Sequence, residues 1–134
     1  MKGDSMTHEN IEIVKKSLGA FQAGDLDTVR ESFADDIVWH IPGKSPMSGD
    51  YKGKEEVLGF LGRTVEMTGG TFKVEPHDIL ASDEHVVILA RQTAEREGKR
   101  LDAQLANVIH IRDGKVAEFW GHPFDLYAGD EFWS

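Results

Sequence analysis

Cysteine is absent from this chain. Its absence excludes disulfide bonds, a thiolate nucleophile and thiolate metal ligands, and it is compatible with a reducing compartment. No apolar run approaches the roughly 18 residues that a membrane-spanning helix needs. The polar residues 1–10 also lack the apolar core of a signal peptide. We therefore expect a cytoplasmic protein that has no membrane partner.

Positive charge is scarce as well. The sequence has 15 Lys and Arg against 24 Asp and Glu, which gives a formal net charge of −9. Nucleic-acid phosphates and anionic membranes attract clustered positive charge, so we expect neither as a partner. The length of 134 residues is typical of one domain. We predict a flexible extension over residues 1–9 and a single domain over residues 10–134.

Apolar residues at helical spacing predict three helices in the first half of the chain. The first covers residues 7–22, with Thr7 placed to cap it. Asp25 is suited to cap a second, short helix, because an acidic side chain there accepts hydrogen bonds from the first turn. The third helix covers the apolar positions between Val57 and Val65 and ends at Gly69.

The second half of the chain has the alternating, β-branched pattern of strands. A first strand over residues 37–41 stops at Pro42, and we expect a mobile connection after it. Asp113-Gly114 is a strong hairpin signal. Helices followed by an antiparallel meander indicate an α+β domain with a bent sheet around the helices. The later strands are expected over residues 71–80, 86–95, 101–111 and 116–122.

This order of elements resembles the nuclear transport factor 2 superfamily, most closely its SnoaL-like and ketosteroid-isomerase-like branch. The similarity covers residues 10–123. The resemblance implies a cone-shaped, cystatin-like roll in which three N-terminal helices pack against a strongly bent, mainly antiparallel sheet. Isomerases, cyclases, epoxide hydrolases and non-catalytic binders share this cone, so the fold does not determine the function. The matching motifs are Phe-Gln-Ala-Gly-Asp-Leu-Asp at 21–27, Phe-Ala-Asp-Asp-Ile-Val-Trp at 33–39 and Asp-Gly-Lys-Val-Ala-Glu-Phe-Trp at 113–120.

The catalytic residues of the related enzymes are replaced in this chain. The base, the tyrosine and the protonated aspartic acid of a ketosteroid isomerase correspond to Ile41, Ser17 and Asn107. The histidine and aspartate of SnoaL-type cyclases correspond to Phe119 and Gly121. We therefore expect neither the ketosteroid isomerase reaction nor the usual SnoaL-type cyclase reaction from these side chains. The amide of Asn107 is able to orient a ligand through a hydrogen bond.

The apolar side chains of the inward strand faces either line a pocket or fill the core. Asn107 shares one strand face with Ala103, Leu105 and Ile109, which predicts that this amide points inward. The predicted ligand-binding residues are Trp39, Ile41, Tyr51, Phe60, Leu105, Asn107, Phe119 and Gly121.

Three ionisable residues are weaker catalytic candidates. Strand parity places His40 and His122 on the outer face of the sheet, although a bulge would turn either imidazole into the cavity. Asp125 follows the last strand, where it lies either at the cavity mouth or in a surface turn. No spacing of ligands indicates a metal site, and we expect neither a metal nor a cofactor.

The leading hypothesis is a homodimer whose cone binds a small, mostly apolar organic molecule. One alternative is an isomerase or lyase that acts on a cyclic ketone, with His40 or His122 as the base. Another is a non-catalytic dimerisation or adaptor module with a filled cone. Val108, Trp120 and His122 predict dimerisation through the outer sheet face. The aromatic tail, residues 124–133, is expected to dock on the domain or on a partner subunit.

Overall fold

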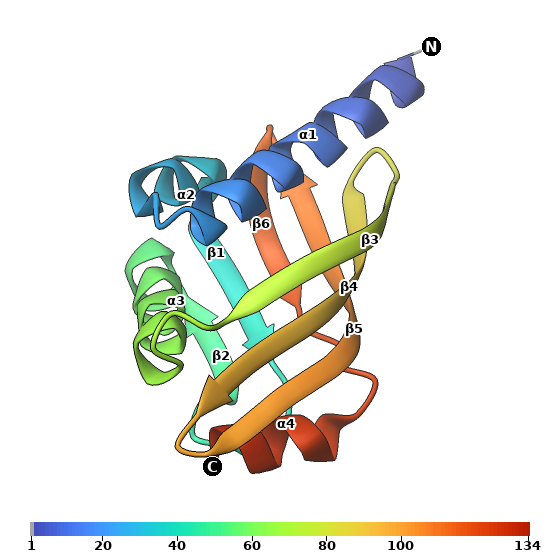
Figure 1. The fold of residues 1–134 in the computed structure, drawn as a ribbon. Coiled ribbons are helices and arrows are strands. Elements are labelled where there is room, and N and C mark those ends of the chain that lie inside the picture. The colour runs from blue at the N-terminus through green and yellow to red at the C-terminus, as the bar shows by residue number, and fades with distance from the viewer. Residues whose placement is uncertain (1) are drawn as a thin grey trace.

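The computed structural model describes the backbone of residues 2–134 and the side chains from Glu9 onward. This part of the chain forms four helices and six strands (Figure 1). The helices are α1 (Lys2–Gln22), α2 (Leu26–Ser32), α3 (Lys54–Met67) and α4 (Leu126–Trp133). The strands are β1 (Phe33–Ile41), β2 (Gly49–Lys52), β3 (Lys73–Ala81), β4 (His85–Arg96), β5 (Lys99–Arg112) and β6 (Lys115–Trp120).

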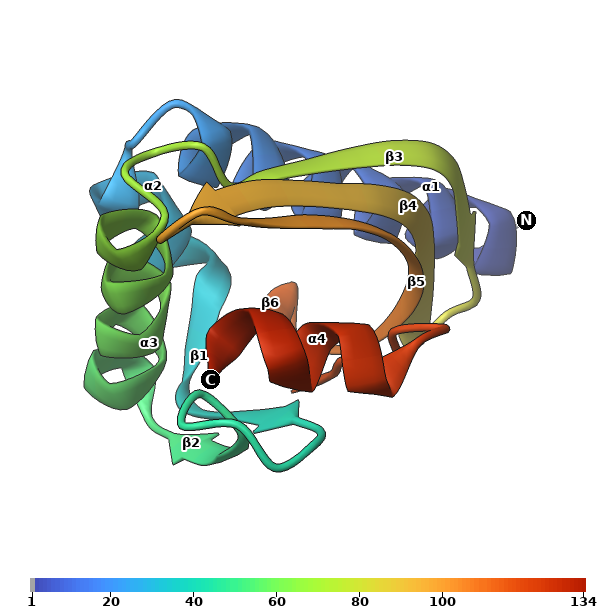
Figure 2. The same cartoon turned by 60° about the horizontal axis from the view of Figure 1, so that its bottom comes forward.

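The strands form one mixed sheet in the order β2-β1-β6-β5-β4-β3. All neighbouring strands are antiparallel except β1 and β6, which are parallel. The sheet bends strongly, α1, α2 and α3 pack beside it, and α4 crosses the open end (Figure 2). This arrangement confirms the predicted α+β, cystatin-like cone with three N-terminal helices.

Local signals set several element boundaries. The carboxylate of Asp25 accepts a hydrogen bond of 3.2 Å from the backbone N–H of Thr28, so it caps α2 as predicted. Asp113 and Gly114 have φ angles of 52° and 73°, the left-handed conformations that a tight hairpin turn requires. The turn therefore joins β5 directly to β6.

Two sequence predictions need correction. Helix α1 begins at Lys2, so Thr7 lies inside the helix and does not cap it. Residues 2–9 of the predicted extension thus have helical backbone, and the side chains of residues 1–8 lie outside the described residues. The connection after Pro42, predicted to be mobile throughout, contains strand β2, which pairs with β1 from Ile41↔Gly49 to Val38↔Lys52.

The core lies between the concave face of the sheet and the helices. Val29 of α2, Ile37 of β1, Val57 of α3 and Val86 of β4 are almost completely buried within it. The apolar face of each amphipathic element thus points into a common interior. In the described residues, no helix has both the length and the apolar composition that crossing a membrane requires.

The C-terminal tail folds back onto the cone as helix α4. Phe132 is 2% exposed and packs in a second apolar cluster with Ala94 of β4 and Leu101 of β5. Phe124 and Tyr127, at the other end of the tail, are 69% and 86% exposed. One face of α4 therefore belongs to the interior, while the start of the tail remains in solvent.

Candidate functional site

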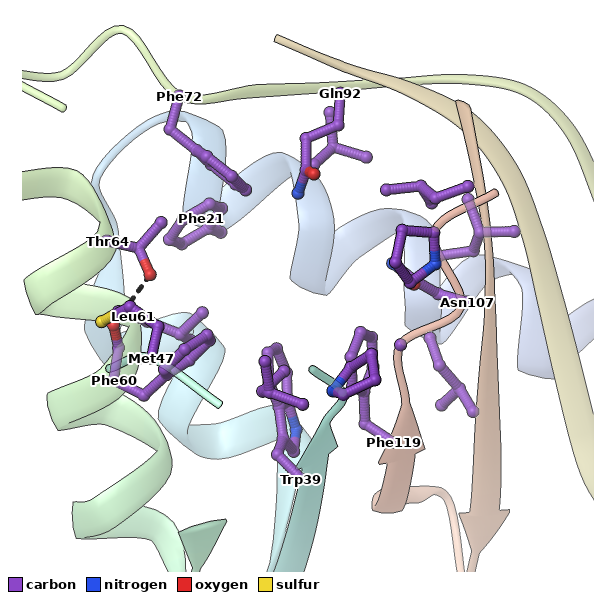
Figure 3. A pocket seen from close by; sticks show the side chains of 18 of the residues that line it. Phe21, Trp39, Met47, Phe60, Leu61, Thr64, Phe72, Gln92, Asn107 and Phe119 are labelled. Carbon is purple, nitrogen blue, oxygen red and sulfur yellow. Dashed lines mark hydrogen bonds between the residues drawn. The ribbon is translucent and has the colours of Figure 1, made fainter. Parts of the chain in front are cut away.

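The cone encloses a cavity of about 200 Å³ between the concave sheet face and the helices. The lining residues come from α1, α2, α3, α4 and the strands β1, β3, β4, β5 and β6, and most of them are apolar (Figure 3). Because every layer of the fold contributes to the wall, the cavity is a property of the whole domain. Its shape depends on the bend of the sheet and on the position of α4.

A stacked aromatic pair forms one side of the cavity. Trp39 of β1 and Phe119 of β6 are direct neighbours in the parallel pairing of these strands. Their rings lie 4.1 Å apart with an interplanar angle of 16°, which is close to parallel stacking. Phe60 of α3 flanks Trp39 at 6.0 Å. This wall presents aromatic surface to the cavity, as ligand pockets commonly do.

Two amide side chains, Gln92 of β4 and Asn107 of β5, reach the cavity from the sheet (Figure 3). Within the described part of the chain, neither amide has a hydrogen-bond partner, and both side chains are only half-buried. Other polar lining groups bond within the protein. Thr64 donates to the carbonyl of Phe60 at 3.0 Å, and Ser17 accepts from Ser32 at 2.9 Å. The indole Nε1 of Trp39 is buried without a hydrogen-bond partner among the described residues. The two amides are the polar groups that reach the cavity from strands β4 and β5.

Helix α4 covers one end of the cavity with residues Leu126, Gly129, Asp130 and Trp133. These positions follow helical spacing, so they share one face of α4. The Asp130 carboxylate accepts a hydrogen bond of 2.9 Å from the backbone N–H of Lys44 in the β1–β2 connection. A side chain on neighbouring Gly43, whose φ is 99°, would collide with this carboxylate. Asp130 therefore fastens α4 to the β1–β2 connection.

Gly121 leaves space in the wall beside Asn107. A Cβ atom at this position would lie 3.4 Å from Pro42, 3.6 Å from Phe119 and 3.8 Å from the Asn107 Oδ1 atom. These are ordinary or only slightly tight contacts, and the φ of Gly121 is not in the left-handed region. The wall therefore accommodates alanine here, whereas a larger side chain would occupy the cavity.

The predicted ligand-binding residues lie in this wall with one exception. The exception is Tyr51, which is absent from the described lining and whose hydroxyl donates a hydrogen bond of 2.7 Å to the carbonyl of Met47. Tyr51 packs against Phe60 with ring centroids 4.7 Å apart, so it supports the aromatic wall from behind. The residues in the wall are Trp39, Ile41, Phe60, Leu105, Asn107, Phe119 and Gly121.

The structure places His40 on the outer face of the sheet. Its Nδ1 lies 2.8 Å from a carboxylate oxygen of Asp50, and its Nε2 lies 2.5 Å from Glu118. The hydrogen bond to Glu118 is the main cause that raises the pKa of His40 above its ordinary value. Burial opposes this rise, and Asp50 adds to it. The ring also stacks on Trp120 at 5.6 Å. No bulge turns His40 inward, so it is not a base in the cavity.

The other two catalytic candidates also lie outside the cavity wall. His122 is exposed, and Asp125 caps α4 by accepting a hydrogen bond of 3.1 Å from the N–H of Ala128. The sequence analysis missed Gln92, although a signal for it was present. The charged residues Arg91 and Glu95 of the same strand suit a solvent-facing side, and alternation along the strand then directs Gln92 inward. Asp130 was also missed, because the structure of the tail was not predicted.

Comparison with known proteins identifies the family. A model of the SnoaL-like domain matches residues 14–119, which is most of the chain. An uncharacterised protein of Mycobacterium tuberculosis is 31% identical over 126 residues, which cover 93% of this chain and 96% of that protein.

Solved structures agree with this assignment. Bal32a, from a soil-derived mobile gene cassette, is 42% identical with a TM-score of 0.93 over 96% of this chain and 99% of that one. A protein of unknown function with a cystatin-like fold from Xanthomonas campestris is 31% identical. Its TM-score is 0.87, and the match covers 92% of this chain and 97% of that one. An NTF2-like protein of Burkholderia xenovorans shares the fold at 23% identity and a TM-score of 0.83. This match covers 96% of this chain and 98% of that one. The chain therefore belongs to the SnoaL-like domain family, and it shares its fold with an NTF2-like protein.

Proposed function

We propose that this protein binds a small, mostly apolar organic molecule in the cone cavity. The observation that carries the proposal is the apolar hollow itself, about 200 Å³ in volume and with the unpartnered amides of Gln92 and Asn107 at its wall. At about 30 Å³ for each water molecule, this space equals six to seven waters. It suits a molecule of one or two rings. A filled cone, as in a purely structural adaptor, would have no such space.

The cavity chemistry favours binding over turnover. An isomerase or lyase that moves a proton needs an ionisable side chain within hydrogen-bond reach of its substrate. His40 and His122 do not face the cavity. Among the described lining residues, Asp130 is the ionisable one, and its carboxylate already accepts the N–H of Lys44. Asn107 and Gln92 are neutral amides, which orient ligands but do not act as bases at neutral pH.

A matched pair of substitutions at Gly121 tests the binding proposal. Gly121→Ala fits the wall, whereas Gly121→Leu places a branched side chain into the cavity. Naphthalene is a suitable probe, and binding is followed by NMR through the backbone and side-chain amide signals. We expect naphthalene to shift signals of cavity residues in the wild type and in Gly121→Ala, but not in Gly121→Leu. Equal binding to all three proteins would show that the cavity is not the site.

We also propose that the outer face of the sheet forms a homodimer interface. Leu80, Val87, Val108 and Trp120 occupy one continuous row across strands β3, β4, β5 and β6. Leu80 is 50% exposed, and the other three side chains are half-buried. A second copy related by a twofold axis would cover this apolar row.

Sedimentation velocity tests the interface. We expect a dimer at micromolar concentration and a monomer for Trp120→Glu. Tyr127→Glu is a matched control, because this exposed side chain lies on α4, away from the row. A wild-type monomer at that concentration would disprove the interface.

A further inference from the structure

The two cavity amides enter the cavity at separate positions along the sheet. Asn107 pairs across the sheet with Ile88, which precedes Gln92 by four residues on β4. At about 3.3 Å per residue, the two amide-bearing positions are about 13 Å apart along the strands. Both side chains enter the cavity, and Figure 3 shows Gln92 across the space from Trp39 and Phe119, with Asn107 to one side. A molecule that spans the cavity from Asn107 to Gln92 therefore has an amide at each of its two ends.

Each of these amides needs a partner of a particular kind. A side-chain amide offers both a carbonyl acceptor and an NH₂ donor, so it pairs well with a hydroxyl, carbonyl or amine. No hydrogen bond joins Gln92 or Asn107 to the other lining residues drawn in Figure 3. A ligand without a polar group at either end would expel water from both amides and leave them unpaired, which is unfavourable. The cavity thus discriminates according to where the ligand carries its polar atoms.

The charge of the site restricts the ligand further. The described wall contains no Lys, Arg or His, and its ionisable residue is Asp130. The protein as a whole has a formal net charge of −9. A carboxylate or phosphate on the ligand would lose its hydration without gaining a cationic partner. Anions are therefore poor ligands for this cavity.

We infer that the cavity selects a neutral, flat molecule of one or two rings that carries a hydroxyl or carbonyl group at each of two opposite ends. Asn107 binds one end, Gln92 binds the other, and the ring system lies between them in the apolar space that Trp39 and Phe119 help to line. This inference rests on the proposed binding function and adds the chemical class of the ligand. It assigns to Gln92 the role of selecting ligands that carry a polar group at the second end.

Four probes of one ring system test the inference: naphthalene, 2-naphthol, 2,6-dihydroxynaphthalene and the anion 6-hydroxy-2-naphthoate. Their dissociation constants are measured by NMR titration. A net hydrogen bond is expected to change affinity by about fivefold, so the diol should bind more tightly than 2-naphthol, and 2-naphthol more tightly than naphthalene. The anion should bind at least tenfold more weakly than the diol.

Leucine variants separate the two amides from the rest of the cavity. Gln92→Leu and Asn107→Leu should each reduce diol binding at least about fivefold, and the double variant should bind naphthalene more tightly than the diol, whose hydroxyls would lose both partners. Gln104→Leu is the control, because Gln104 is an exposed glutamine that lies outside the cavity lining. Replacing an unpaired amide by leucine should not impair folding, and the NMR spectrum of each variant checks this directly.

The outcomes distinguish the two proposals. If no probe binds, the proposed binding function fails, and this inference fails with it. If naphthalene and the diol bind the wild type equally, or if the anion binds as tightly as the diol, the cavity binds apolar molecules but the two-ended selectivity is wrong. A diol preference that disappears in the double variant and persists in Gln104→Leu supports both.

Discussion

Replacing Phe132 with alanine tests whether α4 is an integral part of the cavity wall. The ring of Phe132 is 2% exposed and is buried against Ala94 and Leu101. Removing a core phenylalanine ring in this way destabilises proteins by about 3–5 kcal/mol. Unfolding entropy scales with length at about 2.1 cal/mol/K per residue, or about 0.28 kcal/mol/K for this chain. A loss of about 3 kcal/mol therefore corresponds to a fall in Tm of about 10 °C.

Detachment of α4 from the rest of the domain sets an upper limit to the loss of stability in Phe132→Ala. Helix α4 is also held by Arg96, which donates to the carbonyl of Phe132 at 2.7 Å, and by Lys99, which donates to the carbonyl of Glu131 at 3.1 Å. If α4 detaches as a unit, the measured loss equals the free energy of docking the helix and is smaller than the full cost of the ring. In that case Tm falls less, but the cavity loses one wall and probe binding weakens sharply.

The assay combines thermal melting, amide hydrogen exchange over residues 126–133 and naphthalene binding. Tyr127→Ala is the matched control in the same helix, because Tyr127 is 86% exposed. Its removal should change stability by less than about 0.5 kcal/mol, which is within about 2 °C of the wild-type Tm. The reasoning is refuted if Phe132→Ala resembles Tyr127→Ala in melting, exchange and binding together.

Two further predictions concern ionisable groups. The pKa of folded His40 is raised mainly by Glu118, so protonated His40 stabilises the fold. This contribution is complete below the ordinary pKa of about 6.5 and is lost as the pH rises through the folded value. Glu118→Gln should therefore lower the pKa of His40 in an NMR titration, and a pKa that does not change would contradict the assigned cause. Asp25→Ala should speed hydrogen exchange in α2 because the cap is lost, whereas Asp25→Asn should preserve it; equal exchange in both variants would exclude a capping role.

Periodicity and turn chemistry predicted most of the fold because they are local properties of the chain. The apolar positions from Val57 to Val65 were sufficient to place α3, and Asp113-Gly114 was sufficient to place the last hairpin. The short strand β2 was missed for a physical reason. Its residues include Gly49 and Asp50, which have low strand propensity, and the strand is stabilised by pairing with β1 rather than by its own sequence.

The cavity wall was predictable only where strand alternation was sufficient. Alternation placed Asn107 inward, the family resemblance placed Phe119 on the cavity face, and alternation applied to β4 would have identified Gln92. Tyr51 was misplaced because its orientation depends on β2 and on the hydrogen bond to Met47, neither of which the sequence reveals. Asp130 depends on the return path of α4 and on the space beside Gly43. These are contacts between distant segments, which local patterns do not encode.

The parallel pairing of β1 with β6 has a consequence for the order of events during protein synthesis. Trp39 pairs with Phe119, so β1 and β2 have no neighbour in the rest of the sheet until almost the whole chain has been made. The strands β3, β4 and β5, which are neighbours both in sequence and in space, are able to pair earlier. Until β6 emerges, the nascent chain carries an uncovered strand edge and an exposed aromatic side chain at Trp39, which is the kind of surface that chaperones bind. Residues 115–120 are therefore the segment that joins β1 and β2 to the rest of the sheet.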